Sequence, residues 1–172
     1  MPNWCENKLT VIGDNEDLTV FKDHVKGTGT DMCLNNIVPM PKELYDTTSP
    51  GDDDNWYNWR IRNWGIKWDI DASLIGESDN ILIYEFDSPW APPHEWVRNA
   101  ALIFPDLSFE LYYREPGMCF QGTILAQKDL FINHEDDYVE DIDLDEEEFE
   151  SDDSTTNDGQ NILNVINIDK RE

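Results

Sequence analysis

Five stretches of the chain alternate apolar and polar side chains, which is the period of a half-buried β-strand. They lie at 8–12, 67–74, 81–86, 107–113 and 120–126. Residues typical of turns separate them, and the turn at 77–80 joins the second and third stretches into a hairpin. The pattern therefore predicts five strands.

Three other stretches space their apolar residues as on one face of an α-helix. They lie at 14–27, 55–64 and 93–105. Gly65 is placed to end the second helix in a left-handed conformation. Residues 28–54 have no such period, and we expect an irregular insertion that packs through Ile37, Val38 and Met40.

The order of the elements is strand, helix, an insertion with a second helix, a hairpin, a helix and two strands. Two right-handed β-α-β units around a hairpin predict an α+β fold, a ferredoxin-like βαββαβ sandwich with helices on one face of an antiparallel sheet. The insertion and the last strand are additions to that pattern. We place this domain at 1–134, followed by an acidic C-terminal tail at 135–158 and a short apolar element at 159–172, which is either an edge strand or a helix.

Charge changes the picture more than any other bulk property. The chain has 38 acidic and 12 basic residues, a formal net charge of −26. Residues 135–158 contain fourteen acidic residues and no basic one, so we expect this tail to be disordered in isolation. Direct binding to duplex DNA is disfavoured, because that affinity comes from Lys and Arg. A protein with a basic surface is the expected partner.

Several classes of protein are not expected. The chain lacks an apolar run near the ~20 residues of a membrane span, and its start lacks the features of a signal peptide, so we expect an intracellular protein. The three cysteines, Cys5, Cys33 and Cys119, form no CxxC pair. We therefore expect reduced thiols, no zinc site and no cofactor; an iron–sulfur cluster in particular needs about four thiolates.

The acidic tail is the first candidate site. Carboxylates along it resemble the charge array of DNA, about one charge per 1.7 Å of duplex, and its aromatic residues suit a groove on a partner. The candidate partner-binding residues are Tyr138, Glu140, Asp141, Asp143, Asp145, Glu146, Glu147, Glu148, Phe149 and Glu150. The alternative is a solubilising tail without a partner. The spacing of the acids matches a calcium loop only in part, because the required glycine is missing.

The second candidate site is a base-stacking platform for single-stranded nucleic acid or a nucleotide. Aromatic rings beside arginines are typical of such platforms. The residues are Trp59, Arg60, Arg62 and Trp64. The alternative is that Trp64 belongs to the core and that the arginines pair with acids at 52–54. No local signature pairs a cysteine with a histidine for catalysis, so we do not expect an enzyme. The segment 88–93 fits a partner-binding loop and a structural corner equally well.

Five separated motifs carry a resemblance to a known family. They are Met1-Pro2-Asn3-Trp4-Cys5, Asn36-Ile37-Val38-Pro39-Met40-Pro41, Asn63-Trp64-Gly65-Ile66-Lys67-Trp68-Asp69, Ser88-Pro89-Trp90-Ala91-Pro92-Pro93 and Tyr113-Arg114-Glu115-Pro116-Gly117. Over about residues 1–127 the chain resembles the YubB-type ferredoxin-like domain family of phages, prophages and conjugative plasmids. The resemblance implies the same fold, a mobile-element origin and the cytoplasm of a bacterial host cell, and it implies no activity.

Charge and resemblance together lead to one hypothesis. They predict a non-enzymatic, acidic accessory protein that counteracts a host nucleic-acid-handling or defence protein by DNA mimicry. The alternative hypothesis is the single-strand or nucleotide binder that uses the Trp/Arg platform.

Overall fold

The computed structural model describes residues 2–49 and 54–138. The chain divides into two compact units, Met1–Glu140 and Asp141–Glu172, and the second lies outside the described residues. So do the predicted partner-binding residues from Glu140 to Glu150 and the apolar element at 159–172.

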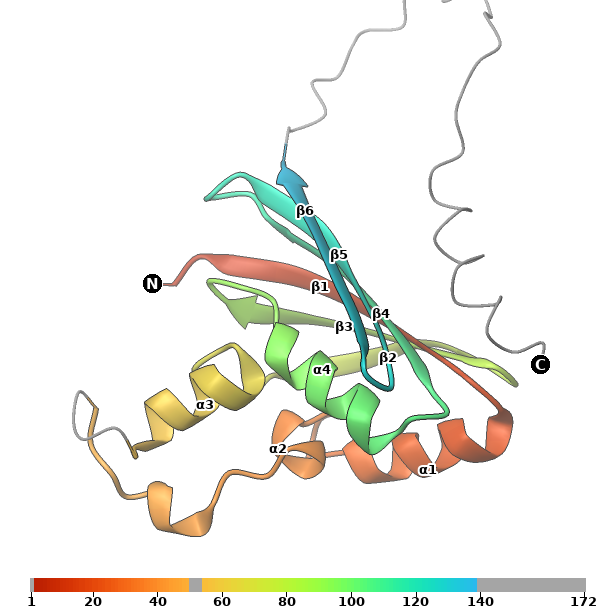
Figure 1. The fold of residues 1–172 in the computed structure, drawn as a ribbon, viewed down its shortest axis with the longest axis horizontal. Helices are drawn as coiled ribbons and strands as arrows, with labels where there is room; N and C mark the ends of the chain where they lie inside the picture. Colours follow the sequence, from red (N-terminus) through yellow and green to blue (C-terminus); the bar gives the residue numbers. More distant parts are fainter. Residues whose placement is uncertain (1, 50–53, 139–172) are drawn as a thin grey trace, which may run out of the picture. The chain divides into compact units, whose positions relative to one another are not determined.

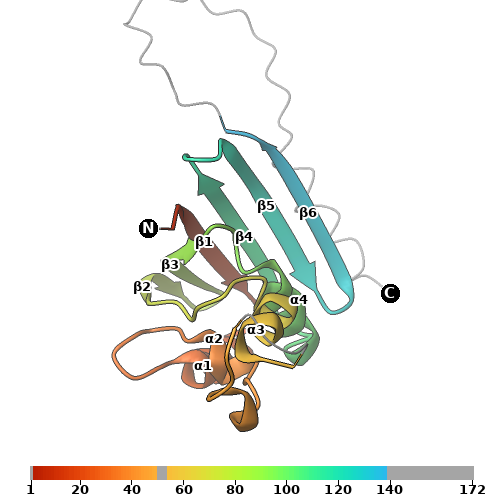
Figure 2. The same cartoon turned by 90° about the vertical axis from the view of Figure 1, so that its left-hand side faces the viewer.

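The described part forms an α+β fold in which helices cover one face of a six-stranded sheet (Figures 1 and 2). The sheet order is β2-β3-β1-β4-β5-β6, and all neighbouring pairs are antiparallel. The strands are β1 (Trp4–Ile12), β2 (Ala72–Ser78), β3 (Ile81–Pro89), β4 (Ser108–Glu115), β5 (Phe120–Gln127) and β6 (Leu130–Asp137). The helices are α1 (Asn15–Val25), α2 (Leu34–Ile37), η1 (Lys42–Leu44), α3 (Trp56–Trp64) and α4 (His94–Ile103). The predicted fold class is confirmed.

The core lies between the helices and one face of the sheet. On the central strand β1, Cys5, Leu9 and Val11 are fully buried, and Asn7 between them is also buried, whereas Glu6 and Lys8 face the other side. Trp64 of α3 and Trp96 of α4 are also fully buried. Their indole N–H groups donate to the carbonyls of Val38 (2.9 Å) and Leu34 (3.0 Å), so the insertion is fastened to the helical layer.

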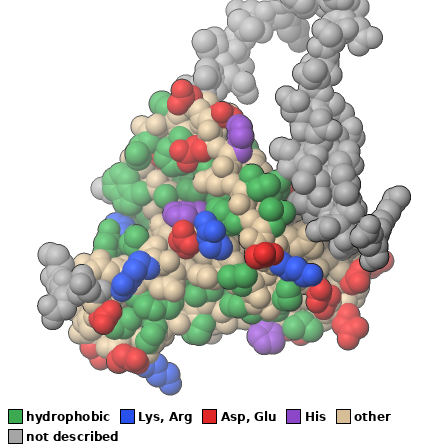
Figure 3. Space-filling model, viewed as in Figure 1, with side chains coloured by type: hydrophobic (Ala, Val, Ile, Leu, Met, Phe, Trp, Pro, Cys, Tyr) green, Lys and Arg blue, Asp and Glu red, His purple; other side chains and the backbone are tan. Residues whose placement is uncertain are grey.

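The insertion packs through the expected residues. Ile37, Val38 and Met40 are at most 9% exposed. Gly65 has φ +85° and ends α3, and a side chain there would collide with His94. Figure 3 shows that Lys and Arg side chains on this side of the molecule are interspersed with acidic and apolar ones.

The hairpin strand β2 differs from the prediction. It begins at Ala72 rather than at 67, and it continues to Ser78 through an irregularity between Leu74 and Gly76. The preceding loop is held in another way, because the Asp69 carboxylate accepts hydrogen bonds from the backbone of Leu34 (2.7 Å) and Asn35 (3.2 Å). The apolar alternation at 67–71 therefore belongs to a loop fastened to α2.

Strand β6 is absent from the predicted elements, and it moves the predicted domain boundary. We expected the tail to start at 135, but the sheet extends to Asp137. All eight residues of β6 pair with β5, and the Tyr113 hydroxyl lies 3.0 Å from side-chain oxygens of both Asn133 and Glu135. The neighbouring strand supplies backbone partners to a segment whose polar sequence does not alternate.

None of the helices in residues 2–49 and 54–138 has the length and apolar character needed to cross a membrane.

Candidate interaction surface on the open face of the sheet

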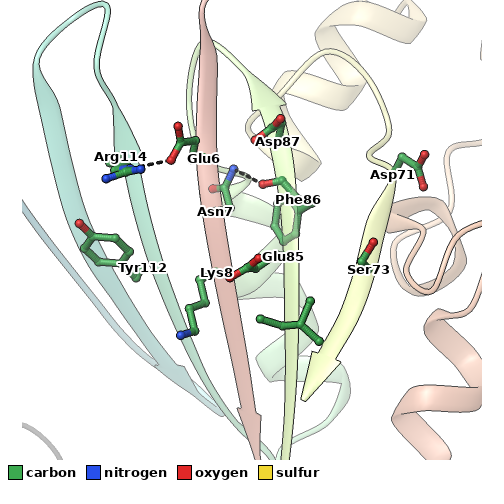
Figure 4. Close-up of a pocket in the computed structure, with 11 residues that line it drawn as sticks. Glu6, Asn7, Lys8, Asp71, Ser73, Glu85, Phe86, Asp87, Tyr112 and Arg114 are labelled. Atoms are coloured by element: carbon green, nitrogen blue, oxygen red, sulfur yellow. Dashed lines mark hydrogen bonds and ion pairs between the residues drawn. The ribbon is translucent and has the colours of Figure 1, made fainter. Parts of the chain in front are cut away.

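The face of the sheet without helices is hollowed over β2, β3, β1 and β4 (Figure 4). The hollow has a volume of about 690 Å³. It is lined by Glu6, Asn7, Lys8, Asp71, Ser73, Ile75, Glu85, Phe86, Asp87, Tyr112 and Arg114. A second hollow of about 440 Å³ continues over β4 and β5 and shares Lys8 and Tyr112 with the first. Together they form the open-face surface.

Strand register brings the charged residues of this surface together. Glu6 lies opposite Asp87 on β3 and opposite Arg114 on β4. Lys8, two residues further along β1, lies opposite Glu85 and Tyr112. Because side chains alternate along a strand, the residues between them on β1 enter the core while Glu6 and Lys8 face outward.

Negative charge dominates the first hollow. Its carboxylates are Glu6, Asp71, Glu85 and Asp87, and its cations are Lys8 and Arg114. Arg114 is already paired, since its Nε lies 2.6 Å from Glu6 Oε2 (Figure 4), and this hydrogen bond raises the pKa of the guanidinium.

The other three carboxylates are not engaged in ion pairs with described residues. Within the described ranges, Asp71, Glu85 and Asp87 form no ion pair. Partial removal from water raises the pKa of Asp87, and the neighbouring Glu6 carboxylate adds to that shift. The site therefore presents a negative potential that an external cation would neutralise.

Cations are concentrated on the helical side instead. Seven of the ten basic residues of 1–134 lie in the helices or in the loops next to them: Lys22, Lys26, Lys42, Arg60, Arg62, Lys67 and Arg98. Several are engaged within the chain. Lys22 pairs with Glu77 at 2.6 Å, Lys67 lies over the ring of Trp68, and Arg98 lies over the ring of Phe131.

The predicted stacking platform is brought together on α3, but its rings are already in use. Trp64 is fully buried, and Trp59 packs edge-on against it with 5.7 Å between ring centroids. The Arg60 guanidinium lies 5.0 Å from the Trp64 ring and 5.4 Å from the Trp56 ring, and burial lowers its pKa. Arg62 lies 3.7 Å from Asp54. This geometry favours the structural alternative, in which the group stabilises α3.

Of the predicted partner-binding residues, the structure places Tyr138. It follows β6, and its backbone N–H donates to the carbonyl of Cys119 at 2.8 Å. The remaining candidates in the acidic tail, residues 140–150, stay a prediction.

The thiols and imidazoles of the described residues lie apart from one another in their hydrogen bonding. Burial raises the pKa of Cys5 to about 12, and burial together with a hydrogen bond to Asp69 raises that of Cys33 to about 11. In the part of the chain that the structure describes, no imidazole forms a hydrogen bond with a thiol. The same part contains no group of three or more His, Cys, Asp or Glu side chains placed to hold a metal ion.

The open-face surface is not among the sites predicted from the sequence. Its residues are the polar members of the alternating strands, such as Lys8 in the first strand and Glu85 in the third. That alternation was the available signal, since it marks the side chains that leave the core. Which of them lie together depends on the register, and pattern alone does not determine it.

Comparison with known proteins identifies the family. A family model described as the ferredoxin-like domain in Api92-like protein matches residues 63–161, which is more than half of the chain. The crystal structure of a protein api92 from Yersinia pseudotuberculosis is similar in fold, with a TM-score of 0.55 and 11% sequence identity, over 81% of this chain and 99% of that one. None of the curated proteins matches. The chain belongs to the family of Api92-like proteins with a ferredoxin-like domain.

Proposed function

We propose that this protein is a non-enzymatic accessory protein of a phage or plasmid of the YubB type, acting in the cytoplasm of a bacterial host cell. It binds a basic host protein that handles nucleic acid or serves in defence, and it inhibits that protein by mimicking the charge of DNA. The observation that carries the proposal is the open-face surface, where Asp71, Glu85 and Asp87 face outward and form no ion pair with any residue that the structure describes.

The position of these carboxylates supports binding rather than stability. Unpaired like charges on a sheet repel one another and contribute nothing to folding. A basic partner removes that repulsion and gains long-range attraction during encounter. The partner is therefore expected to present Lys and Arg, as proteins that bind the phosphate backbone do.

Charge density indicates that the sheet does not act alone. Residues two apart on a strand, such as Glu85 and Asp87, are separated by about 6.6 Å along it. One strand of DNA carries a charge about every 3.4 Å of axis. The open-face surface is thus sparser than DNA, and the fourteen acidic residues of 135–158 supply the additional charge.

The test is affinity capture of host proteins followed by competition. The full chain is compared with a variant ending at Tyr138, which keeps β6 whole, whereas a cut at Asn133 would remove half of that strand. We expect the full chain to retain a nucleic-acid-binding host protein that duplex DNA and about 300 mM salt both displace. We expect the variant to retain it more weakly. Retention that neither DNA nor salt disturbs would contradict the proposal.

The single-strand or nucleotide binder has its own test. Little of that platform is exposed, because Trp64 is buried and Arg60 stacks on the rings of Trp56 and Trp64. A titration with oligonucleotides at low salt, monitored by tryptophan fluorescence, tests whether the protein binds single strands. A saturable change would favour this alternative over DNA mimicry.

A further inference from the structure

Two tryptophans and a methionine belong to neighbouring segments at one end of the sheet. Trp4 begins β1, Trp90 follows β3, and Met118 lies in the turn between β4 and β5 (Figure 1). The backbone N–H of Trp90 donates to the backbone carbonyl of Asn3 at 3.0 Å. A Cβ on Gly117 would lie 2.8 Å from the side-chain nitrogen Nδ2 of Asn3. These contacts place the three segments side by side around Asn3. We name Trp4, Trp90 and Met118 the aromatic rim.

The rim leaves large apolar side chains in solvent. Trp4 is 48% exposed, Trp90 44% and Met118 57%. Single exposed apolar residues are ordinary, but several gathered in one place mark interaction sites. Tryptophan is the residue most enriched at the energetic centre of protein interfaces, and methionine adapts its shape to a partner.

Trp90 is also held in a backbone conformation that bulky residues rarely adopt. Its φ is +72°, in the left-handed region where glycine is the favoured residue. The Ser88 hydroxyl fixes the corner by donating to the Ala91 carbonyl at 2.6 Å, and Ser88 itself is fully buried. The corner therefore carries an exposed indole at a position where glycine would fold more easily.

The residues around the rim favour the binding of a cation. Glu6 lies two residues from Trp4 on the same face of β1, and Asp87 lies opposite Glu6. Elsewhere the chain places its own cations over rings, as with Lys67 over Trp68. In the described structure no cation lies over Trp4 or Trp90. Trp4 thus shares a strand face with Glu6, and within the described residues no cation of the chain covers either indole.

From these observations we infer that the aromatic rim is the anchor that receives an arginine side chain of the basic partner. This inference rests on the proposed function and names the group that the surface recognises. The planar guanidinium stacks on indole and pairs with a carboxylate at the same time, which a lysine ammonium does less well.

Two peptides of about nine residues, oligoarginine and oligolysine, serve as probes. Binding to the full chain is measured by calorimetry at about 50 mM salt. We expect oligoarginine to bind more tightly than oligolysine. Replacing both tryptophans, Trp4→Ala with Trp90→Ala, weakens oligoarginine binding about tenfold and removes the preference, because both peptides then bind by charge alone.

Trp68→Ala is the matched control, since Trp68 is 40% exposed and lies outside the rim. It leaves the preference for arginine unchanged. Circular dichroism confirms that each variant is folded, and Trp4→Phe with Trp90→Phe retains rings and part of the preference. If the double alanine variant binds oligoarginine within twofold of the unchanged chain, the inference is overturned while the proposed function stands. If neither peptide binds the unchanged chain, the proposed function fails as well.

A second measurement needs no substitution. Hydroxyl-radical labelling of the unchanged chain is followed by mass spectrometry with and without oligoarginine. We expect the peptide to protect Trp4, Trp90 and Met118 and to leave Trp68 labelled. Equal labelling of the rim in both samples contradicts the inference.

Discussion

The two faces of the sheet use the same strands for different purposes. On β1, Cys5, Leu9 and Val11 are fully buried under the helices, while Glu6 and Lys8 line the hollow on the other side. The helix-covered face is apolar, and several cations around it are paired or stacked within the chain. On the open face, Asp71, Glu85 and Asp87 form no ion pair within residues 2–49 and 54–138. Alternate residues of one strand thus serve the core and the surface proposed for binding, so substitutions on one face can test stability apart from binding.

The largest expected effect lies on the helix-covered side. Trp64→Ala removes a fully buried indole and leaves the Val38 carbonyl without its donor. We expect the free energy of unfolding to fall by about 3–5 kcal/mol. Trp68→Ala, which alters an exposed ring, costs about 1 kcal/mol or less. Urea denaturation measures both, and equal losses would show that the helix-covered side is not the stability core.

The next effect concerns charge on the open face. The triple variant Asp71→Asn, Glu85→Gln and Asp87→Asn removes the unpaired carboxylates of the hollow. We expect about tenfold weaker binding of oligoarginine at low salt, with little change in stability. The control removes three exposed acids from the helical side, Asp23→Asn, Glu43→Gln and Asp46→Asn. Similar weakening by both variants would mean that net charge, and not the open face, determines binding.

A smaller effect concerns the ion pair within the open face. Glu6 and Arg114 are 2.6 Å apart, but their side chains are 49% and 43% exposed. Water and salt screen such pairs, so a double-mutant cycle with Glu6→Gln and Arg114→Gln should give a coupling energy of about 0.5 kcal/mol. Urea denaturation at low salt and near 1 M salt measures it, and the coupling should decrease at the higher salt. A coupling that does not decrease would indicate a desolvated pair.

The smallest effect is a dependence of stability on pH at Asp87. Partial desolvation and the Glu6 carboxylate raise the pKa of Asp87 in the folded state. The folded chain therefore holds this proton more tightly than the unfolded chain, and its stability decreases as pH rises through the folded pKa. We expect Asp87→Asn to stabilise the protein slightly at pH 7, and we expect the difference to disappear near about pH 3, where the carboxyl is neutral in both states. Thermal unfolding against pH, with Asp23→Asn as control, measures this, and destabilisation at pH 7 would contradict it.

Much of the domain was predictable from the sequence because its periods are clear. Leu18, Phe21 and Val25 are spaced for a helix and are buried in α1. Residues 107–113 alternate, and Phe109, Leu111 and Tyr113 are buried in β4. The hairpin begins later in the structure than the sequence predicts, because the alternation that starts at Trp68 belongs to a loop held by Asp69.

The candidate site was less predictable. Aromatic and basic residues lie close together in the chain at Trp59, Arg60, Arg62 and Trp64, and this proximity predicts a stacking platform. In the structure, residues this close in sequence contact one another, as the stacking of Arg60 on Trp64 demonstrates. The open-face residues Glu6 and Arg114 are far apart in sequence, and only the pairing of β1 with β4 brings them into contact.

The fold class, most of the helices and strands and the strong acidity follow from the sequence alone, because they depend on local periods and on composition. The extent of the sheet through β6, the burial of Trp64 and the proximity of the segments that carry Trp4, Trp90 and Met118 follow only from the folded structure. These features depend on register and on contacts between distant segments. A strand pattern repeats every two residues and so marks which side chains face outward, but the neighbouring strands determine which of them lie together.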